Sequence, residues 1–320
     1  MTSDKALVGL ALSVAVNLCA AQTPPEWAYP VNPPGFKPRP DDGTPRHVPE
    51  SNASYTLTQL RDRFISPVWH PEEHPPQPEI VARGRKPDVY ACGFCHRADG
   101  PGGPENANLM GLPAKYIAQQ MADYKSGARR TAVPGRNTEL MISLAKATTE
   151  AEVEAAAAYF SAIKPRAVIR VVETDSVPRT YITGWHYALL GNGEQEALGS
   201  RIIEVPEVYE RFESRDTHAR FIAYVPPGSV KKGEALAATG GGKTVACASC
   251  HGPGLAGAAD LPRIAGRSPT YIVRQLYEFK HGIRAGAQSA QMKPTVENLA
   301  IDDMIALAAY AASLPPQPQH

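Results

Sequence analysis

Two short segments of the sequence combine two cysteines with an adjacent histidine. The motif C-x-x-C-H occurs once as Cys92, Cys95 and His96 and once as Cys247, Cys250 and His251. This spacing is the attachment signal for haem c. Each thiol can add to one vinyl group of the porphyrin, and the histidine that follows then faces the iron. The sequence therefore predicts two covalently attached haem c groups, each with one of these histidines as an iron ligand.

Two other uses of paired cysteines fit the sequence less well. A zinc site brings four ligands together, with pairs about 15–20 residues apart, whereas these pairs are 155 residues apart and each has its own histidine. A thioredoxin-like redox pair expects one C-x-x-C near a βαβ pattern. Neither alternative explains two complete motifs.

The similarity between the two halves extends beyond the motif. Residues 92–129 align with residues 247–284 without a gap, and 11 of these 38 positions are identical. After a four-residue insertion in the first copy, Met141 aligns with Met292 and Tyr159 with Tyr310. Self-similarity of this kind indicates two copies of one folding unit. We call residues 79–165 the first unit and residues 226–316 the second unit.

Methionine is the usual second axial ligand of an electron-transfer haem. A lone methionine more often packs in a core than binds a metal, but Met141 and Met292 are the two that coincide in both copies. We therefore predict both as iron ligands. For the first unit, an unpaired histidine such as His70 or His74 is the competing ligand.

Helical periodicity dominates each unit. Apolar residues recur at helical spacing over residues 116–125 and 271–280, and Gly127 and Gly282 follow as stop signals. The last helix of each unit is expected over residues 150–163, with a capping box from Thr149 and Glu152, and over residues 301–314. Weaker helix patterns precede the motifs, over residues 80–84 and 230–238.

Four repeated polar residues follow or begin the helices after the motif. Arg129 and Arg284 suit pairing with a haem propionate, because a guanidinium binds a carboxylate through two hydrogen bonds; a solvated helix end is the alternative. Tyr116 and Tyr271 can hydrogen-bond to the same group or simply pack. We predict these four side chains as haem-binding residues.

Two regions lie outside the repeat. Residues 22–78 hold many of the 31 prolines of the chain and are expected to form an extended arm rather than a third core. Residues 166–225 form an insert between the units, long for a linker. Its β-branched runs at 167–172 and 201–205 are expected to pair as a short ribbon.

The N-terminus has the pattern of an export signal. An apolar stretch over residues 6–18 follows Lys5, is too short to span a bilayer and precedes small residues. Residues 1–21 are therefore predicted to be a cleaved signal peptide; a lipid anchor through Cys19 and an uncleaved anchor are the alternatives. Since no other long apolar stretch occurs, we expect a periplasmic protein with no transmembrane segment after cleavage.

The overall charge is close to zero. The chain has 33 basic and 32 acidic residues and a formal net charge of +1. A dedicated nucleic-acid-binding protein would show a basic excess. With little long-range steering, docking to partners is expected to be transient and to use local patches around exposed haem edges.

These features together resemble a family. C-x-x-C-H, then Tyr-Ile-x-x-Gln, Lys-x-Gly-x-Arg, a methionine and an Ala/Tyr helix resemble the tandem dihaem class I cytochromes c of the c-four type. The resemblance implies an all-α fold of two domains, each wrapped around one haem with histidine and methionine ligands. It also implies that the protein carries electrons between periplasmic partners. Pro262 lies where the family has a proline whose carbonyl holds the haem histidine, whereas the first unit has Ala107.

We therefore expect an electron carrier rather than an enzyme. It would connect a dehydrogenase or respiratory complex with a terminal oxidase or reductase, and the arm could dock to a specific dehydrogenase. One alternative is a dihaem peroxidase-like oxidoreductase, which would need one iron open to substrate. The other is a cytochrome subunit bound permanently to a periplasmic dehydrogenase.

Overall fold

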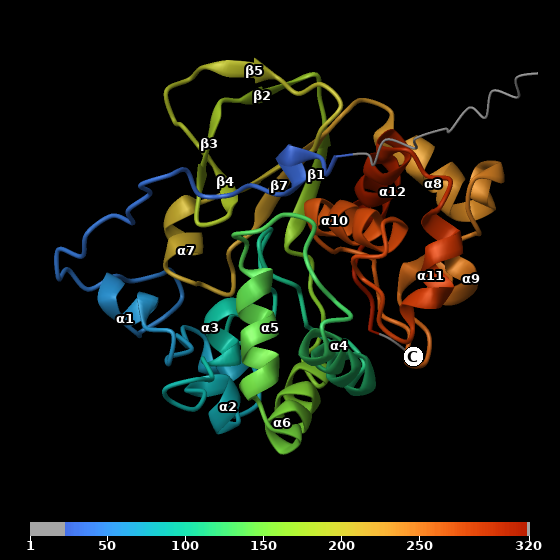
Figure 1. Ribbon diagram of the computed structural model, residues 1–320. Helices are drawn as coiled ribbons and strands as arrows, with labels where there is room; N and C mark the ends of the chain where they lie inside the picture. Colours follow the sequence, from blue (N-terminus) through green and yellow to red (C-terminus); the bar gives the residue numbers. More distant parts are fainter. Residues whose placement is uncertain (1–22, 319–320) are drawn as a thin grey trace, which may run out of the picture.

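The computed structural model of the chain describes residues 23–318, so the signal peptide predicted for residues 1–21 lies outside the described part. Two helical units lie next to each other, and a strand-bearing insert packs against both (Figure 1). The helices of the first unit are α2 (Glu79–Ala82), α3 (Cys92–His96), α4 (Ala114–Ser126), α5 (Thr138–Ala147) and α6 (Glu150–Ser161). Those of the second unit are α8 (Ser229–Thr239), α9 (Ala248–His251), α10 (Pro269–Lys280), α11 (Ser289–Val296) and α12 (Ile301–Ser313), with 3-10 turns η3 (Gly240–Gly242) and η4 (Pro253–Leu255).

The helices expected from periodicity are confirmed. Helices α4 and α10 cover the two long patterns after the motifs, and α6 and α12 end the two units. Helix α6 begins with the predicted capping box, since the Thr149 hydroxyl accepts from the Glu152 amide and the Glu152 carboxylate accepts from the Thr149 amide. Helix α4 ends where Gly127 adopts a φ of 76°, a conformation that favours glycine.

The second unit is built around a close crossing of α8 and α12. A Cβ atom added to Gly233 of α8 would lie 1.9 Å from the carbonyl oxygen of Ala306 in α12. Only a glycine therefore lets the two backbones approach this far. Their contact closes the core that also includes Val273, Leu299 and Met304. The corresponding helix of the first unit, α2, is much shorter and packs on α3 and α6.

The insert forms small sheets rather than one ribbon. Strand β7 (Phe221–Val225) lies between β1 (Ile169–Glu173), which is parallel to it, and β6 (Ile203–Pro206), which is antiparallel. The two runs expected to pair with each other are both strands, but that pairing is wrong because β7 separates them. The other elements are the pairs β2 (Ser176–Pro178) with β5 (Gln195–Ala197) and β3 (Thr180–Thr183) with β4 (His186–Leu189), and helix α7 (Tyr209–Glu213).

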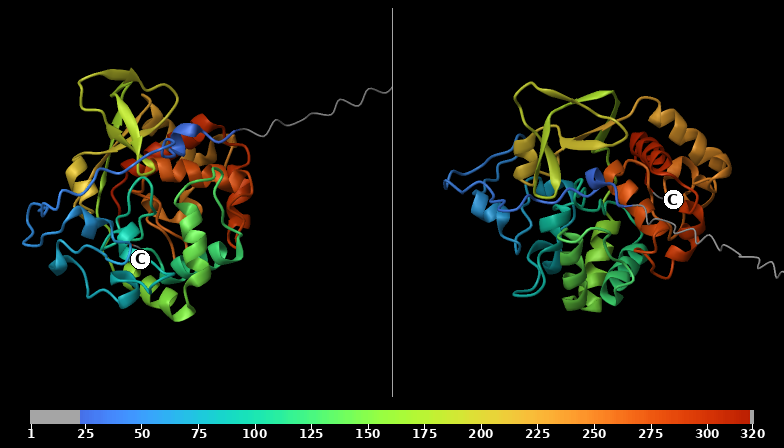
Figure 2. Two further views of the ribbon diagram at one scale, coloured as in Figure 1. Left: turned by 60° about the vertical axis from the view of Figure 1, so that its left-hand side comes forward. Right: turned by 45° about the horizontal axis from the view of Figure 1, so that its top comes forward.

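The arm has a small core of its own, so the expectation of a purely extended segment is wrong. Its buried side chains are Val48, Leu57, Leu60 and Trp69. Its regular elements are η1 (Glu26–Ala28), α1 (Leu57–Arg61) and η2 (Pro71–Glu73). The arm starts against α10 of the second unit and then runs past the insert to the first unit (Figure 2).

Residues 23–318 include no helix long and apolar enough to cross a membrane.

The helix crossing can be tested with Gly233→Ala. The added methyl group forces α8 and α12 apart, and overpacking of this kind costs about 1–3 kcal/mol. We expect a matching loss in the free energy of unfolding, measured by denaturant titration of the haem-loaded protein. Glu234→Ala, on the exposed side of the same helix, is the control and should change it little. Equal stability of Gly233→Ala and Glu234→Ala would contradict the crossing.

Candidate functional site

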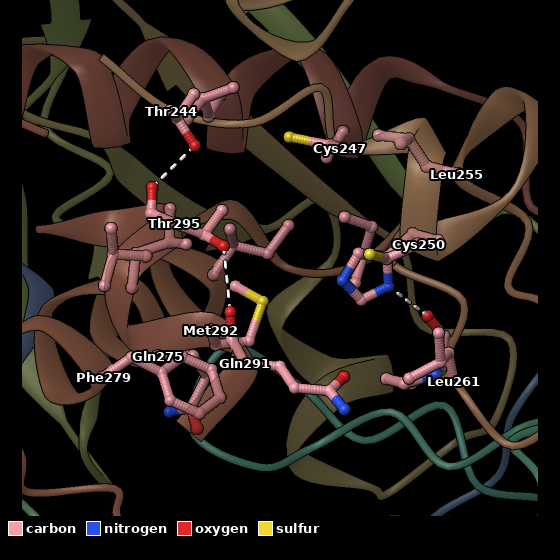
Figure 3. A pocket seen from close by; sticks show the side chains of 18 of the residues that line it. Thr244, Cys247, Cys250, Leu255, Leu261, Gln275, Phe279, Gln291, Met292 and Thr295 are labelled. Atoms are coloured by element: carbon pink, nitrogen blue, oxygen red, sulfur yellow. Dashed lines mark hydrogen bonds between the residues drawn. The ribbon is translucent and has the colours of Figure 1, made fainter. Parts of the chain in front are cut away.

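A cavity of about 310 Å³ lies inside the second unit. Cys247 and Cys250 lie on one side of it and Met292 faces it from α11 (Figure 3). The rest of the wall is mostly apolar, with Leu255 and Phe279 among its side chains. The cavity therefore combines two thiols and a thioether in one apolar space, and His251 lines it as well.

The ring of His251 is held in one orientation. Its Nδ1 lies 2.8 Å from the carbonyl oxygen of Pro262. Because a carbonyl can only accept, Nδ1 carries the proton and the Nε2 lone pair remains free for a metal. Burial lowers the pKa of His251, despite the carbonyl, which raises it, so the neutral ring is favoured.

The first unit repeats this arrangement around a smaller cavity of about 100 Å³. His96 and Met141 line it, and His96 Nδ1 lies 2.8 Å from the carbonyl oxygen of Ala107. The backbone carbonyl of Ala107 thus orients the His96 ring in the same way that the carbonyl of Pro262 orients the His251 ring. Cys92 and Cys95 lie in the same helix as His96 but are not among the residues lining this cavity. Burial raises the pKa of the Cys92 thiol to about 12.

The methionines lie on helices that the sequence did not predict. Met141 is on α5 and Met292 on α11, and each lines the cavity that its own histidine lines. The competing histidines lie elsewhere. His70 contacts Asp216 of the insert, and His74 contacts the hydroxyl of Tyr159. Neither lines the first cavity, so the structure favours Met141 over a histidine of the arm as the ligand of the first unit.

Arg129 and Arg284 lie in the contact between the units, where the chain forms a short antiparallel bridge. Each guanidinium binds the glutamine of its own unit and the tyrosine and glutamine of the other. The Arg129 bonds go to Gln120 (2.8 Å), Tyr271 (2.8 Å) and Gln275 (2.9 Å), and the Arg284 bonds go to Gln275 (2.9 Å), Tyr116 (2.9 Å) and Gln120 (2.7 Å). We call these six residues the crossed network.

The crossed network also forms part of both cavity walls. Tyr116, Gln120, Tyr271 and Gln275 line both cavities, as does Arg267. Both network arginines are buried, so the alternative of a solvated helix end is wrong. Although burial raises the pKa of Tyr271, Arg129, Arg267 and Arg284 lower it to about 8. Three guanidinium groups therefore act on this hydroxyl in the wall between the cavities.

This wall suits an anionic group. The Nε atoms of Arg267 and Arg284 are buried and have no hydrogen-bond partner in the described structure. Haem has two carboxylates at one edge, and a buried guanidinium binds a carboxylate well. The thiols, the free imidazole nitrogen, the methionine sulfur and these donors thus fit haem c in the second unit. The same donor types recur in the first.

The sequence indicated some residues of this site and missed others. Gln120 and Gln275 were visible as repeated residues, but no chemistry pointed to them. Arg267 has no counterpart in the first copy, where Leu112 aligns with it, so the repeat gave no signal for it.

Comparison with known proteins gives consistent relatives. The sequence profile of the family described as Cytochrome c matches residues 230–315. A "Thiosulfate dehydrogenase electron acceptor" of Thiomonas intermedia is 28% identical over 72% of this chain and 82% of its own. Cytochrome c4 of Stutzerimonas stutzeri is 25% identical over 71% of this chain and 85% of its own. Cytochrome c-554(547) of Halothiobacillus neapolitanus is 38% identical over 23% of this chain and 92% of its own.

One solved structure has a similar fold over most of the chain. It is the thiosulfate dehydrogenase TsdBA from Marichromatium purpuratum, with a TM-score of 0.51 and 26% sequence identity. The match covers 74% of this chain and 39% of that chain. This chain therefore corresponds to well under half of that protein.

The crossed network can be tested with Arg129→Met. The change removes three hydrogen bonds of a buried guanidinium: the Tyr271 hydroxyl loses its donor, while Gln120 and Gln275 keep only their bonds to Arg284. Hydrogen bonds to charged groups contribute about 1.5–3 kcal/mol each. We expect the free energy of unfolding to fall by at least about 2 kcal/mol. Arg130→Met, at the exposed neighbouring position, is the control. A loss no larger than that of the control would show that the network does not hold the units together.

Proposed function

The chain belongs to the tandem dihaem class I cytochromes c of the cytochrome c4 type, and we propose on this premise that it accepts electrons from a periplasmic thiosulfate-oxidising dehydrogenase. Its role is to carry single electrons between redox partners, and it is not itself an enzyme. It holds two covalently attached haem c groups. When bound, each haem supplies a one-electron Fe(III)/Fe(II) couple.

Each haem is held by one C-x-x-C-H motif and one methionine. Cys92 and Cys95 form the thioether bonds of the first unit, and Cys247 and Cys250 those of the second. His96 and His251 donate their Nε2 atoms to iron, which is supported by the carbonyl bound at each Nδ1. Met141 and Met292 complete the coordination. Their support is that each lines the cavity of its own histidine, in both copies.

The crossed network and Arg267 would hold the propionates of bound haem. Arg267 and Arg284 offer unpaired Nε atoms there, and Tyr116 and Tyr271 line both cavities. Both terminal nitrogens of Arg129 already donate to the network, so its role toward haem is electrostatic. Because the two cavities share this wall, electron transfer between bound haems would cross it.

The donor is inferred from the relatives. The Thiomonas intermedia relative, which is aligned over 82% of its own length, is named "Thiosulfate dehydrogenase electron acceptor". The TsdBA structure has a similar fold. Such a donor acts outside the cytoplasm, in line with the signal peptide predicted for residues 1–21. The exposed stretch of the arm, residues 33–40, is a docking contact for the dehydrogenase that does not itself have to carry the electron.

The repeated donor set carries this proposal and can be tested by spectroscopy. Ferric and ferrous spectra of the mature protein should show the iron–methionine charge-transfer band and no shift when carbon monoxide is added to the ferrous form. Met292→Ala and Met141→Ala should each let about half of the haem bind carbon monoxide, because each opens one iron. Met121→Leu, which changes a cavity residue without a repeated partner, is the control. A shift in the unmodified protein would contradict closed coordination.

The donor can be tested by mixing the oxidised protein with a purified thiosulfate dehydrogenase and thiosulfate. We expect both haems to become reduced, since two electrons are released for each tetrathionate formed. Ascorbate reduction in a parallel sample checks that both haems are competent. Reduction by ascorbate but not by the enzyme would exclude this donor.

A further inference from the structure

The two C-x-x-C-H helices differ in exposure although their sequences are copies. In the second unit the residues between the cysteines, Ala248 and Ser249, are exposed. In the first unit their counterparts, Gly93 and Phe94, are buried. Thioether bonds join the cysteines to the porphyrin edge that carries the vinyl groups, so the intervening residues overlie that edge. A haem attached to the second motif would therefore have this edge near the surface, and a haem attached to the first motif would have it covered.

The cover over the first motif comes from the arm and the insert. A Cβ atom added to Gly93 would lie 2.2 Å from the Ser66 hydroxyl oxygen of the arm. Arg215 of the insert places its guanidinium carbon 3.6 Å from the centre of the Phe94 ring. Its N–H groups bind the carbonyl oxygens of Leu60 at 2.6 Å and Phe94 at 2.7 Å. We call Ser66, Arg215 and Leu60 the seal.

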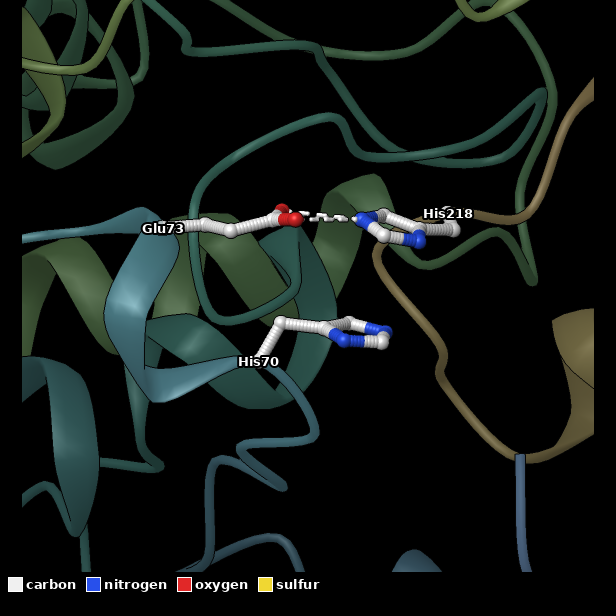
Figure 4. Close-up of side chains that lie close together, drawn as sticks. All are labelled: His70, Glu73 and His218. Atoms are coloured by element: carbon white, nitrogen blue, oxygen red, sulfur yellow. Dashed lines mark hydrogen bonds and ion pairs between the residues drawn. The ribbon is translucent and has the colours of Figure 1, made fainter. Parts of the chain in front are cut away.

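Further contacts fasten the arm to the insert behind the seal. The indole N–H of Trp69 donates to the carbonyl of Ser214 at 2.7 Å. His70 contacts Asp216 at 3.1 Å, and His218 contacts Glu73 at 2.8 Å (Figure 4). These contacts keep Arg215 over Phe94, because they hold residues on both sides of it in sequence.

His70, Glu73 and His218 resemble a metal site in composition, but their geometry does not suit one. The two imidazole rings are stacked, 3.9 Å apart and inclined by 9°. The lone pairs of ring nitrogens lie in the ring planes, so those of parallel rings do not converge on one ion. The cluster therefore links the arm to the insert rather than binding a metal ion.

The mouth of the second cavity has the opposite character. Val245, Ser249, Gln288 and Gln291 line the cavity and are exposed; we call them the open mouth. Residues 244–259 and 285–292 around it contain no Lys, Arg, Asp or Glu, and the exposed Lys243 and Lys293 directly flank them. Val245 is 56% exposed, the largest value among the exposed large hydrophobic residues described.

The corresponding positions of the first unit are occupied by internal contacts. Tyr90, the counterpart of Val245, packs against Phe64 with ring centres 5.3 Å apart. Asn137, the counterpart of Gln288, donates to the side chain of Asn106 at 2.7 Å. The corresponding segments of the first unit are charged, at Arg97, Asp99, Arg136 and Glu139.

We propose that the open mouth is the single port through which the protein exchanges electrons with other proteins. Its partner is a redox protein that presents an uncharged patch around its own exposed cofactor. In each encounter the partner loses or gains one electron and the haem of the second unit gains or loses it. The haem of the first unit is reached only through the second unit, across the crossed network. The proposal rests on the carrier function proposed above.

The port can be tested with Val245→Asp, which places a carboxylate in the docking surface. With a reduced monohaem cytochrome c as protein donor, stopped-flow measurement should show the second-order rate constant reduced about tenfold, since a charge would be desolvated on docking. Reduction by durohydroquinone, a small neutral donor, should be nearly unchanged. Val208→Asp makes the same change at a residue 48% exposed in the insert and should behave as the unmodified protein. The rate of the unmodified protein should vary little with ionic strength.

The seal can be tested first in the unmodified protein and then with Arg215→Ala. A neutral nitroxide added to the ferrous protein should broaden the proton resonances of the second-unit haem edge much more than those of the first. Arg215→Ala should broaden the first-unit resonances and restore cytochrome-driven reduction in the Val245→Asp background.

Different failures have different meanings. Equal broadening of both haem edges, or an unchanged rate for Val245→Asp, would overturn the single port and leave the carrier function standing. If the unmodified protein takes electrons from durohydroquinone but from no protein donor, the carrier function fails and the port with it.

Discussion

The crossed hydrogen bonds of Arg129 and Arg284 fix how the two halves of the molecule face each other. Each guanidinium is buried and holds acceptors from both units. A rotation of one unit against the other would leave two charges without partners and away from water, which is costly. Electron tunnelling falls steeply with distance. A contact that cannot slide therefore keeps the path between the two haem sites constant.

The same network explains why residues outside the haem motif recur in both copies. A tyrosine, a glutamine and an arginine from each unit are needed to complete it, because each arginine uses acceptors of the other unit. Mutual use of this kind is the property of a two-fold interface. The residues that recur in both copies thus form the contact between the two units as well as the haem sites.

The sequence predicts what local chemistry determines. The C-x-x-C-H motifs, the capping box at Thr149 and the helix stop at Gly127 depend on neighbours within a few residues. The methionine helix α11 was not predicted, because Pro294 lies inside it and helical patterns usually end at proline. The pairing of β7 with two strands and the contact of Trp69 with Ser214 join segments far apart in sequence. No periodicity signals such contacts, so the sheet order and the arm's core could not be predicted.

The contacts of the arm also limit the order in which parts of the chain can fold. Ala28 and Tyr29 are buried in the core of the second unit, and the Ala28 carbonyl accepts from Arg274, 246 residues later in the chain. Contacts between such distant residues form late, because the chain must first lose the conformational entropy of closing a long loop. Likewise, Arg215 covers Phe94 across 121 residues. Arg215 can therefore complete the cover over the first C-x-x-C-H motif only after the insert has been made, which leaves a period for the haem to be attached before the chain closes over it.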